Sequence, residues 1–443
     1  MTDVVNITIL GGGPAGLAVG YYAHKAGVPF VLYEASERVG GNCSTRVCGD
    51  FRYDSGAHRL HDRDPEITRE LKSLLGDGLR RIDLPSQIYD DGRLIRFPLA
   101  AAQLFKHLGV ARFSRAAFEL ARARLEGDGN GSFEDFALHR YGATLAERFL
   151  FNYSEKLWGA PPAELSAAVA GKRLSGLDLR SFIADSLTRG RATRKDVEGV
   201  FYYPRLGIGA IPDRLAQACG EDRIRTNCPV TSVSHHGGRI RAIEVEGRSR
   251  VPVDQVVSSL PLPLFLRMLD PPPRPEVLDL TRTIRYRQVR LVVILLDRES
   301  VTEAATVYFP DRRFPFTRLY EPRNRCPDMA PPAKTSLVAE IPCYEDDHEW
   351  NASDDSLVRV VSDQLLDLGW VRPEEMIGAS TDRLYNAYPV LDIHHEATVA
   401  AIHSYLDRFQ NLRLTGRSGR FVYGWIHDMM RFGLETVADI TGE

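Results

Sequence analysis

Residues 6–16, Asn6-Ile-Thr-Ile-Leu10-Gly11-Gly12-Gly13-Pro14-Ala15-Gly16, form a short apolar run that leads directly into a glycine-rich turn. Residues 17–26 then have helical spacing, and a second apolar run at 29–33 stops at Glu34. A strand, a glycine-rich turn, a helix and a strand that ends in an acid are the parts of a dinucleotide-binding βαβ unit. The alternative interpretation is a glycine-rich turn in some other α/β unit. We therefore predict an α/β fold that begins with a dinucleotide-binding unit.

Each glycine of this turn has a separate task in such a unit. Gly11 makes the tight turn, Gly13 lets the backbone approach a pyrophosphate, and Gly16 lets the helix pack on the strand. The first N–H groups of the helix have no partner within it and attract phosphates. Glu34 would accept hydrogen bonds from the ribose hydroxyls.

A second glycine pair follows in the segment Arg38-Val-Gly40-Gly41-Asn42-Cys43-Ser44-Thr45. A bare NAD domain does not need this pair, whereas glycine backbone can lie along the remainder of a longer cofactor. We therefore expect noncovalent FAD. The chain has no second strand–turn–helix unit of this kind, so any NAD(P)H that reduces the flavin would bind transiently near the same site.

The composition excludes several classes of protein. The 443 residues carry a formal net charge of −3, which argues against a dedicated nucleic-acid binder. The six cysteines have no zinc-ligand spacing and form no disulfide framework. We therefore expect no metal site and a location in the reducing cytoplasm. No apolar run approaches the roughly 20 residues that cross a membrane. A small-molecule substrate is the remaining kind of partner.

The order of apolar patterns predicts three parts. We expect a Rossmann-like FAD-binding domain in discontinuous pieces, residues 1–95, 196–265 and 390–443. A helical domain at 96–195 and an antiparallel β-sheet substrate domain at 266–389 would be inserted into it. Within the helical domain, Ser132 followed by two acids predicts the start of a helix over 133–141.

The segment around Gly41, together with Tyr53-Asp-Ser-Gly-Ala57-His58, resembles the amine oxidase and protoporphyrinogen oxidase group of FAD proteins. More narrowly, the chain resembles the UDP-galactopyranose mutases, especially the eukaryotic-type sequences. The similarity runs in order along nearly the whole chain, through Gly92-Arg-Leu-Ile-Arg-Phe97-Pro98, Phe151-Asn-Tyr-Ser154-Glu-Lys156-Leu-Trp158-Gly, Gly171-Lys-Arg173, Tyr202-Tyr-Pro204-Arg-Leu-Gly207-Ile-Gly209, Tyr308-Phe-Pro310 with Phe314-Pro-Phe-Thr-Arg318, Tyr385-Asn-Ala-Tyr388-Pro389, and Gly416-Arg417 with Tyr423.

This resemblance implies a flavin-dependent sugar-nucleotide mutase that interconverts pyranose and furanose rings, or does related anomeric-carbon chemistry, with reduced FAD. The alternative is an FAD-dependent oxidoreductase of the amine oxidase or protoporphyrinogen oxidase type that acts on an amine or another hydride donor. The implied catalytic residues are Arg318, Arg173, His58 and Arg417. The implied substrate-binding residues are Tyr308, Tyr388, Tyr423, Phe97, Ser154, Trp158, Arg325 and His61. The implied cofactor-binding residues are Gly11, Gly13, Pro14, Ala15, Gly16, Glu34, Ala35, Arg38, Gly40, Gly41, Asn42, Ser44, Gly56, Val230, Gly416, Arg417, Gly433, Leu434 and Thr436.

The chain also departs from the family pattern. Ser154 stands where the family has Asn, Thr306 where it has an aromatic residue, Arg325 where it has Tyr, and Leu99 where it has an aromatic residue. Several of these positions line the uridine end of the family's pocket, so we expect a different base or sugar. For Arg318, a role in substrate binding alone predicts that its replacement leaves FAD content and melting temperature almost unchanged.

Overall fold

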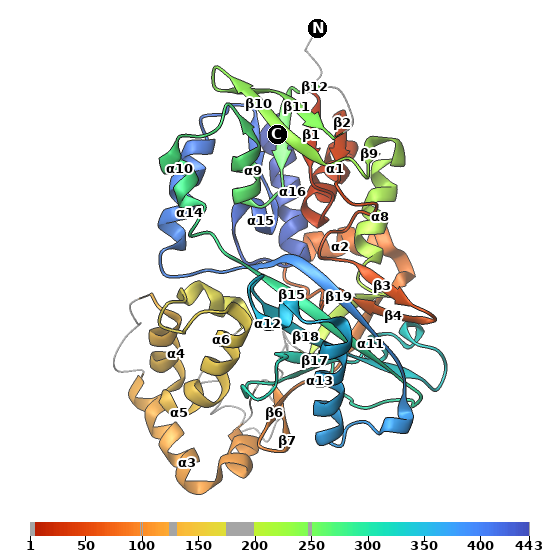
Figure 1. Ribbon diagram of the computed structural model, residues 1–443, viewed down its shortest axis with the longest axis vertical. Coiled ribbons are helices and arrows are strands. Elements are labelled where there is room, and N and C mark those ends of the chain that lie inside the picture. The colour runs from red at the N-terminus through yellow and green to blue at the C-terminus, as the bar shows by residue number, and fades with distance from the viewer. Residues whose placement is uncertain are drawn as a thin grey trace.

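The computed structural model describes residues 5–97, 99, 101–123, 131–173, 199–246 and 250–442. Helices that the sequence predicts between 174 and 195 lie outside these residues. The molecule is elongated. One part contains a parallel sheet with the first and last described residues, and a large sheet beside a group of helices lies at the far end (Figure 1).

A five-stranded parallel sheet forms the centre of the first part. Its strand order is β20-β13-β1-β2-β9, and every neighbouring pair is parallel. The strands are β1 (Ile7–Leu10), β2 (Phe30–Tyr33), β9 (Ile224–Arg225), β13 (Gln255–Ser258) and β20 (Leu412–Leu414). They come from three separate stretches of the chain, which confirms the predicted Rossmann-like unit and its discontinuity.

Helix α1 (Pro14–Lys25) follows β1 and packs against the C-terminal helix α16 (Ile426–Thr441). The helices approach so closely at Gly433 that a Cβ there would lie 2.6 Å from the Cβ of Ala18. Other elements around the parallel sheet are α2 (Pro65–Leu75), α8 (Ala210–Cys219), α9 (Leu262–Met268), α10 (Pro275–Leu280), α14 (His395–Leu406), α15 (Gly416–Arg420), and the strands β10 (Val230–His236), β11 (Arg239–Val245), β12 (Val251–Pro252) and β14 (Leu269–Asp270) of a four-stranded sheet.

The second sheet has seven strands in the order β19-β15-β18-β17-β16-β6-β7. They are β6 (Ser86–Asp90), β7 (Arg93–Phe97), β15 (Tyr286–Leu296), β16 (Thr306–Tyr308), β17 (Arg318–Tyr320), β18 (Thr335–Cys343) and β19 (Met376–Pro389). The sheet differs from the antiparallel one predicted, because β6 and β16 pair in parallel. Residues 86–95, which the sequence assigns to the cofactor domain, form β6 and part of β7 in this sheet.

The helical part contains α3 (Ala101–Ala123), α4 (Phe133–Tyr141), α5 (Ala143–Leu145), a π-helical segment (Ala146–Phe151), α6 (Asn152–Trp158) and a 3-10 segment (Ala167–Arg173). The predicted start of α4 is confirmed, since the Ser132 hydroxyl accepts a hydrogen bond from Asp135 N at 3.1 Å. Gly109 has non-helical dihedral angles and divides α3 into two parts. No helix among the described residues is long and apolar enough to cross a membrane.

Short elements complete the fold. They are the hairpin β3 (Thr45–Cys48) and β4 (Phe51–Asp54), the pair β5 (Leu79–Asp83) and β8 (Val200–Pro204), and the helices α11 (Pro322–Arg325), α12 (His348–Asn351) and α13 (Asp354–Asp367).

Candidate active site

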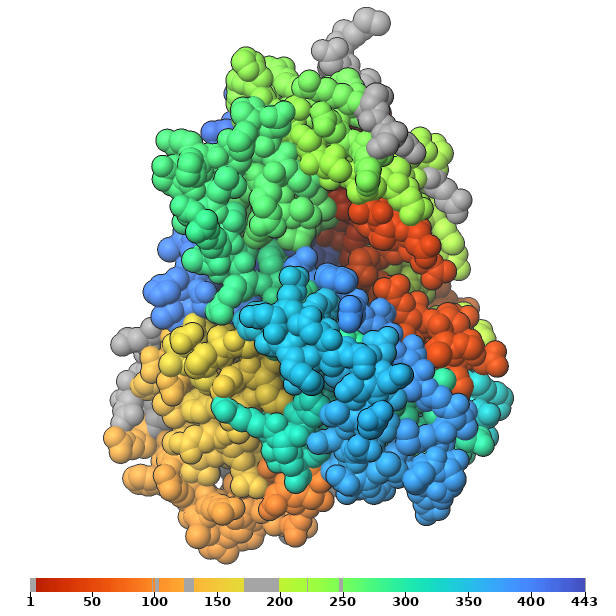
Figure 2. Space-filling model, in the orientation of Figure 1, coloured from red at the N-terminus to blue at the C-terminus, as the bar shows by residue number. Residues whose placement is uncertain are grey.

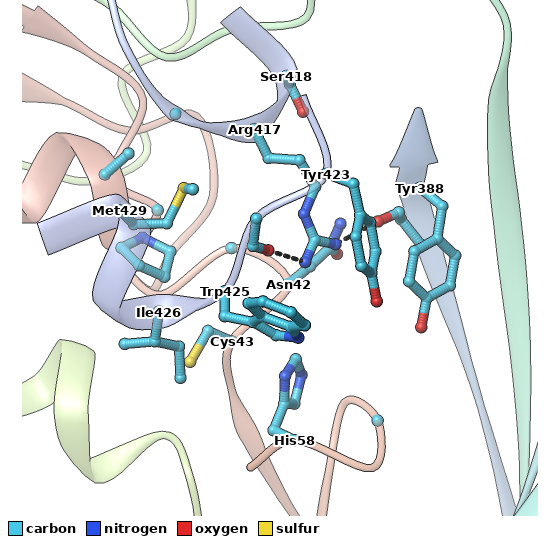
Figure 3. A pocket seen from close by; sticks show the side chains of 18 of the residues that line it. Asn42, Cys43, His58, Tyr388, Arg417, Ser418, Tyr423, Trp425, Ile426 and Met429 are labelled. Carbon is cyan, nitrogen blue, oxygen red and sulfur yellow. Dashed lines mark hydrogen bonds between the residues drawn. The ribbon is translucent and has the colours of Figure 1, made fainter. Parts of the chain in front are cut away.

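A cavity of about 360 Å³ lies where the part with the parallel sheet meets the seven-stranded sheet. Its walls come from residues distant in sequence: the turn at Gly13, the loop at Asn42, the 56–63 loop, residues 385–388 of β19, and the 416–429 segment. Tyr308 and Arg318 line it from β16 and β17. Figure 3 shows Arg417, Trp425 and His58 projecting into the same space.

The wall at the start of α1 fits the pyrophosphate of a dinucleotide. Gly13, Pro14 and Ala15 line the cavity, and the helix has neither a capping side chain nor an acid in its first turn. A Cβ at Gly13 would meet no atom within 4 Å, whereas one at Gly16 would lie 1.9 Å from the carbonyl oxygen of Gly11. The Glu34 carboxylate accepts a hydrogen bond from Gly12 N at 2.6 Å at the end of β2. Open backbone N–H groups beside a carboxylate suit the phosphates and ribose of FAD.

Strand β19 bulges into the cavity at residues 385–387. The pairing with β15 shifts register between Arg287 and Val289, and Asn386 has a positive φ of 50°. A bulge leaves carbonyl groups without ladder partners. Two of these carbonyls accept hydrogen bonds from other segments of the cavity wall. Asn42 Nδ2 donates to Tyr385 O at 2.9 Å, and Arg417 Nη1 donates to Ala387 O at 2.8 Å. The bulge therefore joins the N-terminal loop to the C-terminal segment.

Two charged side chains form hydrogen bonds with the backbone of the His58 loop. Glu340 Oε1 accepts a hydrogen bond from Ala57 N at 2.6 Å, and Arg325 Nη1 donates to His58 O at 3.1 Å. Burial and the positive charges of Arg417, Arg318 and Arg325 lower the pKa of His58 to about 3. His58 is therefore neutral near pH 7, when it can exchange hydrogen bonds but carries no charge.

Arg318 is part of a buried ion pair. Its Nε donates to Glu340 Oε2 at 2.5 Å and its Nη2 donates to the Tyr388 hydroxyl, and both members of the ion pair are at most 5% exposed. Burial lowers the pKa of Arg318, but the Glu340 carboxylate and the neighbouring tyrosines, Tyr388 foremost, together raise the pKa well above the ordinary value. The guanidinium is thus fixed beside the cavity and already compensated by one carboxylate.

Aromatic rings surround the second cavity arginine. The Arg417 guanidinium lies 5.6 Å from the ring centre of Tyr388 and 5.3 Å from that of Tyr423, and it donates to Gly424 O at 2.6 Å. Trp158 of α6 packs edge-on against both tyrosines. The cavity-facing hydroxyls and guanidinium groups are therefore carried by a packed aromatic cluster.

The charge of the cavity wall is one-sided. Among the described residues, the wall contains four arginines and two histidines but no carboxylate, namely Arg59, Arg63, Arg318, Arg417, His58 and His61. Such a wall attracts anions and repels cationic amines.

The structure brings fifteen of the predicted site residues to the cavity wall: Gly11, Gly13, Pro14, Ala15, Gly41, Asn42, Gly56, His58, His61, Tyr308, Arg318, Tyr388, Gly416, Arg417 and Tyr423. Beside the wall, Phe97 packs on Tyr308, and Ser154 is buried on α6. Arg325 lies behind the His58 loop, where it donates to Thr306 Oγ1 at 3.2 Å. Two departures from the family pattern therefore contact each other there. Arg173 ends a 3-10 segment, and its side chain lies outside the described atoms.

Other predicted cofactor residues lie away from this cavity. Gly433, Leu434 and Thr436 belong to the face of α16 that packs into the core or bonds within the helix. Ala35 and Arg38 are exposed after β2, and Val230 begins β10. Gly40 and Ser44 flank the part of the 41–43 loop that faces the cavity.

The sequence interpretation missed Glu340, Trp425 and Arg63. Glu340 is a single acid within the apolar strand 335–343, a pattern that predicts a buried cationic partner. Trp425 and Arg63 come from different walls and stack at 3.8 Å between the guanidinium carbon and the ring centre. No sequence pattern predicts the contact between Arg63 and Trp425.

Comparison with known proteins gives the following similarities. Residues 14–382 match the model of the family described as flavin containing amine oxidoreductase. A protoporphyrinogen oxidase 1 from the chloroplast of Arabidopsis thaliana is 28% identical over 178 residues, which are 38% of this chain and a third (33%) of that protein. The structure of a reduced UDP-galactopyranose mutase is 19% identical with a TM-score of 0.85, over 99% of this chain and 94% of that one. A chain from Exiguobacterium sp. 255-15, assigned as a protoporphyrinogen oxidase, is 20% identical with a TM-score of 0.79, over 99% of both chains.

Proposed function

Because the chain belongs to the flavin-containing amine oxidoreductase family, which implies FAD, we propose that it is an FAD-dependent enzyme whose substrate is an anion. More specifically, we propose a mutase that isomerises the ring of a pyrophosphate-linked sugar. The observation that carries this proposal is the cavity wall, with four arginines and no carboxylate among the described residues.

The arginines and tyrosines suit a diphosphate. A planar guanidinium gives two parallel donors to phosphate oxygens, and charge-assisted bonds of this kind are roughly twice as strong as neutral ones. Arg417 and Arg318 line one region of the cavity, where Tyr308, Tyr388 and Tyr423 add hydroxyl donors. These side chains would bind the diphosphate, orient the sugar and stabilise the charge that develops as the diphosphate leaves.

The cofactor would be held by the α1 turn, Glu34, Asn42 and Gly416. When bound, reduced FAD supplies an electron-rich centre that can react at an anomeric carbon, and oxidised FAD can accept a hydride. His58 is neutral at pH 7, so its role is to hold a hydrogen bond at the cavity wall rather than to supply a charge.

The alternative function is the oxidation of a hydride donor. The family and the relative from Arabidopsis favour an oxidase, whereas the charge of the wall disfavours a cationic amine as its substrate. An anionic hydride donor is compatible with the wall. The two functions differ in whether electrons are consumed.

A redox balance on the FAD-loaded protein distinguishes them. Protein prereduced with dithionite and kept without oxygen would be mixed with UDP-, GDP-, dTDP- and CDP-sugars, and products would be separated by ion-exchange chromatography. We expect one nucleotide sugar to be converted to an isomer, with no further reductant consumed. Steady peroxide formation coupled to substrate in air, with no isomer from any sugar nucleotide, would contradict the mutase and support the oxidase.

Two neighbouring arginines provide a matched pair of variants. Arg417 lines the cavity, whereas Arg420, one turn later on α15, has a side chain that is 37% exposed and lies outside the wall. Arg417→Met should weaken binding of the substrate by roughly a hundredfold, as the loss of a charge-assisted bidentate contact does, while Arg420→Met should leave it unchanged. Equal effects of both variants on substrate binding would refute the proposal that the arginines of the cavity wall bind the substrate.

A further inference from the structure

The turn between β16 and β17 connects two residues that line the cavity. Tyr308 ends β16, Arg318 begins β17, and the two are register partners in the antiparallel pair. Residues 309–317 form the turn, which Phe309 N closes by donating to Thr317 O at 2.8 Å. The positions of both cavity side chains therefore depend on how this turn is held.

Lys156 of α6 forms hydrogen bonds with the turn from the helical part of the molecule. Its ammonium group donates to Phe309 O at 2.8 Å, at one end of the turn. It also donates to Asp311 O at 2.9 Å and to Phe316 O at 2.8 Å. An ammonium group has three N–H donors and no acceptor, so these bonds use its whole capacity. Figure 2 shows the helical part, in yellow near residue 150, directly against the teal segment near residue 310.

The same helix packs against the aromatic residues of the site. The ring of Tyr153 contacts the ring of Tyr308 edge-on, with the ring centres 5.6 Å apart. Trp158 packs edge-on against Tyr388 and Tyr423. Helix α6 therefore contacts the cavity residues on both sides of Lys156, although Lys156 itself does not line the cavity.

Lys156 keeps its charge without a carboxylate partner. Among the described residues, the ammonium group is bonded to carbonyl oxygens and forms no ion pair. Burial lowers the pKa of Lys156 to about 7, and the negative charge of Asp311 acts in the opposite direction. Other charged or titratable side chains on the surrounding elements are Tyr153 and Glu155 of α6, Arg312 and Arg313 of the turn, Arg287 of β15, and Glu340 and Tyr344 on or beside β18.

We propose that Lys156 is a positioning residue, whose ammonium group fixes the 309–317 turn on α6 and so holds Tyr308 and Arg318 in the geometry that binds a diphosphate. The inference rests on the proposed function, which makes these two side chains ligands of an anion. Glu340 holds the Arg318 guanidinium directly. The turn therefore matters most for Tyr308, the neighbour of Phe309.

Binding of inorganic pyrophosphate to the FAD-loaded protein, measured by calorimetry at about pH 6, tests the proposal. Lys156→Met keeps the length of the side chain but removes every donor. We expect its Kd to rise by roughly tenfold, because displaced donors lose part of their charge-assisted bonds to phosphate. The matched control is Arg312→Met, since Arg312 also joins the turn to α6, through Asn152 and Glu155, but is 61% exposed. Exposed ion pairs contribute little, so its Kd should change by less than about twofold.

The pH dependence separates the ammonium group from the packing of its carbon chain. A neutral amine has two N–H donors and cannot donate to all three carbonyl groups. The ratio of the Kd of Lys156→Met to that of the parent should therefore decrease from about pH 6 to about pH 8, as Lys156 loses its proton. The ionisation of pyrophosphate cancels in this ratio. A ratio that is the same at both pH values would overturn the ammonium group as the positioning element.

Hydrogen–deuterium exchange without a ligand distinguishes this inference from the proposed function. Peptides from residues 306–320 should exchange at least roughly fivefold faster in Lys156→Met, whereas residues 395–406 of α14 should keep the rate of the parent. In the parent alone, the 306–320 peptides should gain exchange relative to α14 from about pH 6 to about pH 8, a comparison that needs no variant.

The outcomes lead to different conclusions. A parent that does not bind pyrophosphate contradicts the proposed function, while faster exchange of the turn in Lys156→Met still supports the role of Lys156. Unchanged exchange of the turn, or equal pyrophosphate affinity of parent and Lys156→Met, would overturn the inference. Flavin absorbance and melting temperature verify that each variant is folded.

Discussion

Breaking the Arg318–Glu340 ion pair should destabilise the protein, in contrast to what a role in substrate binding alone predicts. Both side chains are almost completely buried, and Nε and Oε2 are 2.5 Å apart. Removal of one member of a buried pair leaves the other charge unpaired, which typically costs about 3–5 kcal/mol. Arg318→Met and Glu340→Gln should therefore each lower the free energy of unfolding by about this amount.

The double variant and the pH dependence make this prediction specific. Arg318→Met with Glu340→Gln leaves no unpaired charge, so it should regain at least about half of the loss of either single variant. In Arg318→Met alone, the Glu340 carboxylate is buried without its cation, and protonation removes the unpaired charge. The folded state then favours the protonated acid, so the defect should be small at pH 5 and grow as the pH rises to 8.

Denaturant unfolding of the FAD-loaded variants, followed by circular dichroism at pH 5 and pH 8, measures both effects. An Arg318→Met protein as stable as the parent at pH 8 would refute the reasoning, and so would a defect that grows toward acid pH. A double variant as unstable as the sum of the single ones would show that the two side chains do not interact.

Three further predictions concern the cofactor turn and the His58 loop. Gly13→Asp should leave the fold intact, because its Cβ meets no atom within 4 Å, but abolish FAD retention by placing a carboxylate among the phosphate-binding N–H groups; flavin absorbance after gel filtration measures this. The unfolded chain binds a proton at His58 below pH 6.5, whereas the folded chain binds it only near pH 3. The melting temperature should therefore decrease as the pH is lowered from 6.5 to 3, and His58→Asn should make this decrease smaller. Arg325→Lys, whose ammonium cannot make all three donor contacts of the guanidinium, should release the His58 carbonyl and weaken FAD binding by about tenfold in a fluorescence titration, with little change if the loop is held by Glu340 alone.

The βαβ unit could be predicted from the sequence because its determinants are local. The strand, the turn and the helix of residues 7–25 each depend on neighbours within a few positions. The helix begins three residues before the run with helical spacing, and the other bounds lie within one residue of those expected. The same holds for α4, whose start depends on one hydroxyl and one N–H three residues apart.

The arrangement of the candidate site was harder to predict because its contacts join distant residues. Glu340 meets Arg318 across two strands and Ala57 across 283 residues, and Asn42 meets the β19 bulge across 343 residues. Arg325 could be recognised as a polar residue at a site position, but its direction depends on where the short helix α11 ends. Sequence spacing does not determine whether such a side chain points into the cavity or lies behind the residues that line it.

The two cavity arginines differ in the charge that they retain for a ligand. Arg318 is paired with a buried carboxylate, so an anion beside it meets a compensated charge and gains mainly from the fixed direction of the donors. Arg417 binds two backbone carbonyls, and no carboxylate among the described residues lies within ion-pair distance of it. Carbonyl groups orient a guanidinium without cancelling its charge, and the half-buried Arg417 lies against the rings of Tyr388 and Tyr423, which lower the local dielectric constant below that of water. The electrostatic part of anion binding should therefore come mainly from Arg417, while Arg318 supplies geometry and connects the ligand, through Glu340, to the backbone of the His58 loop.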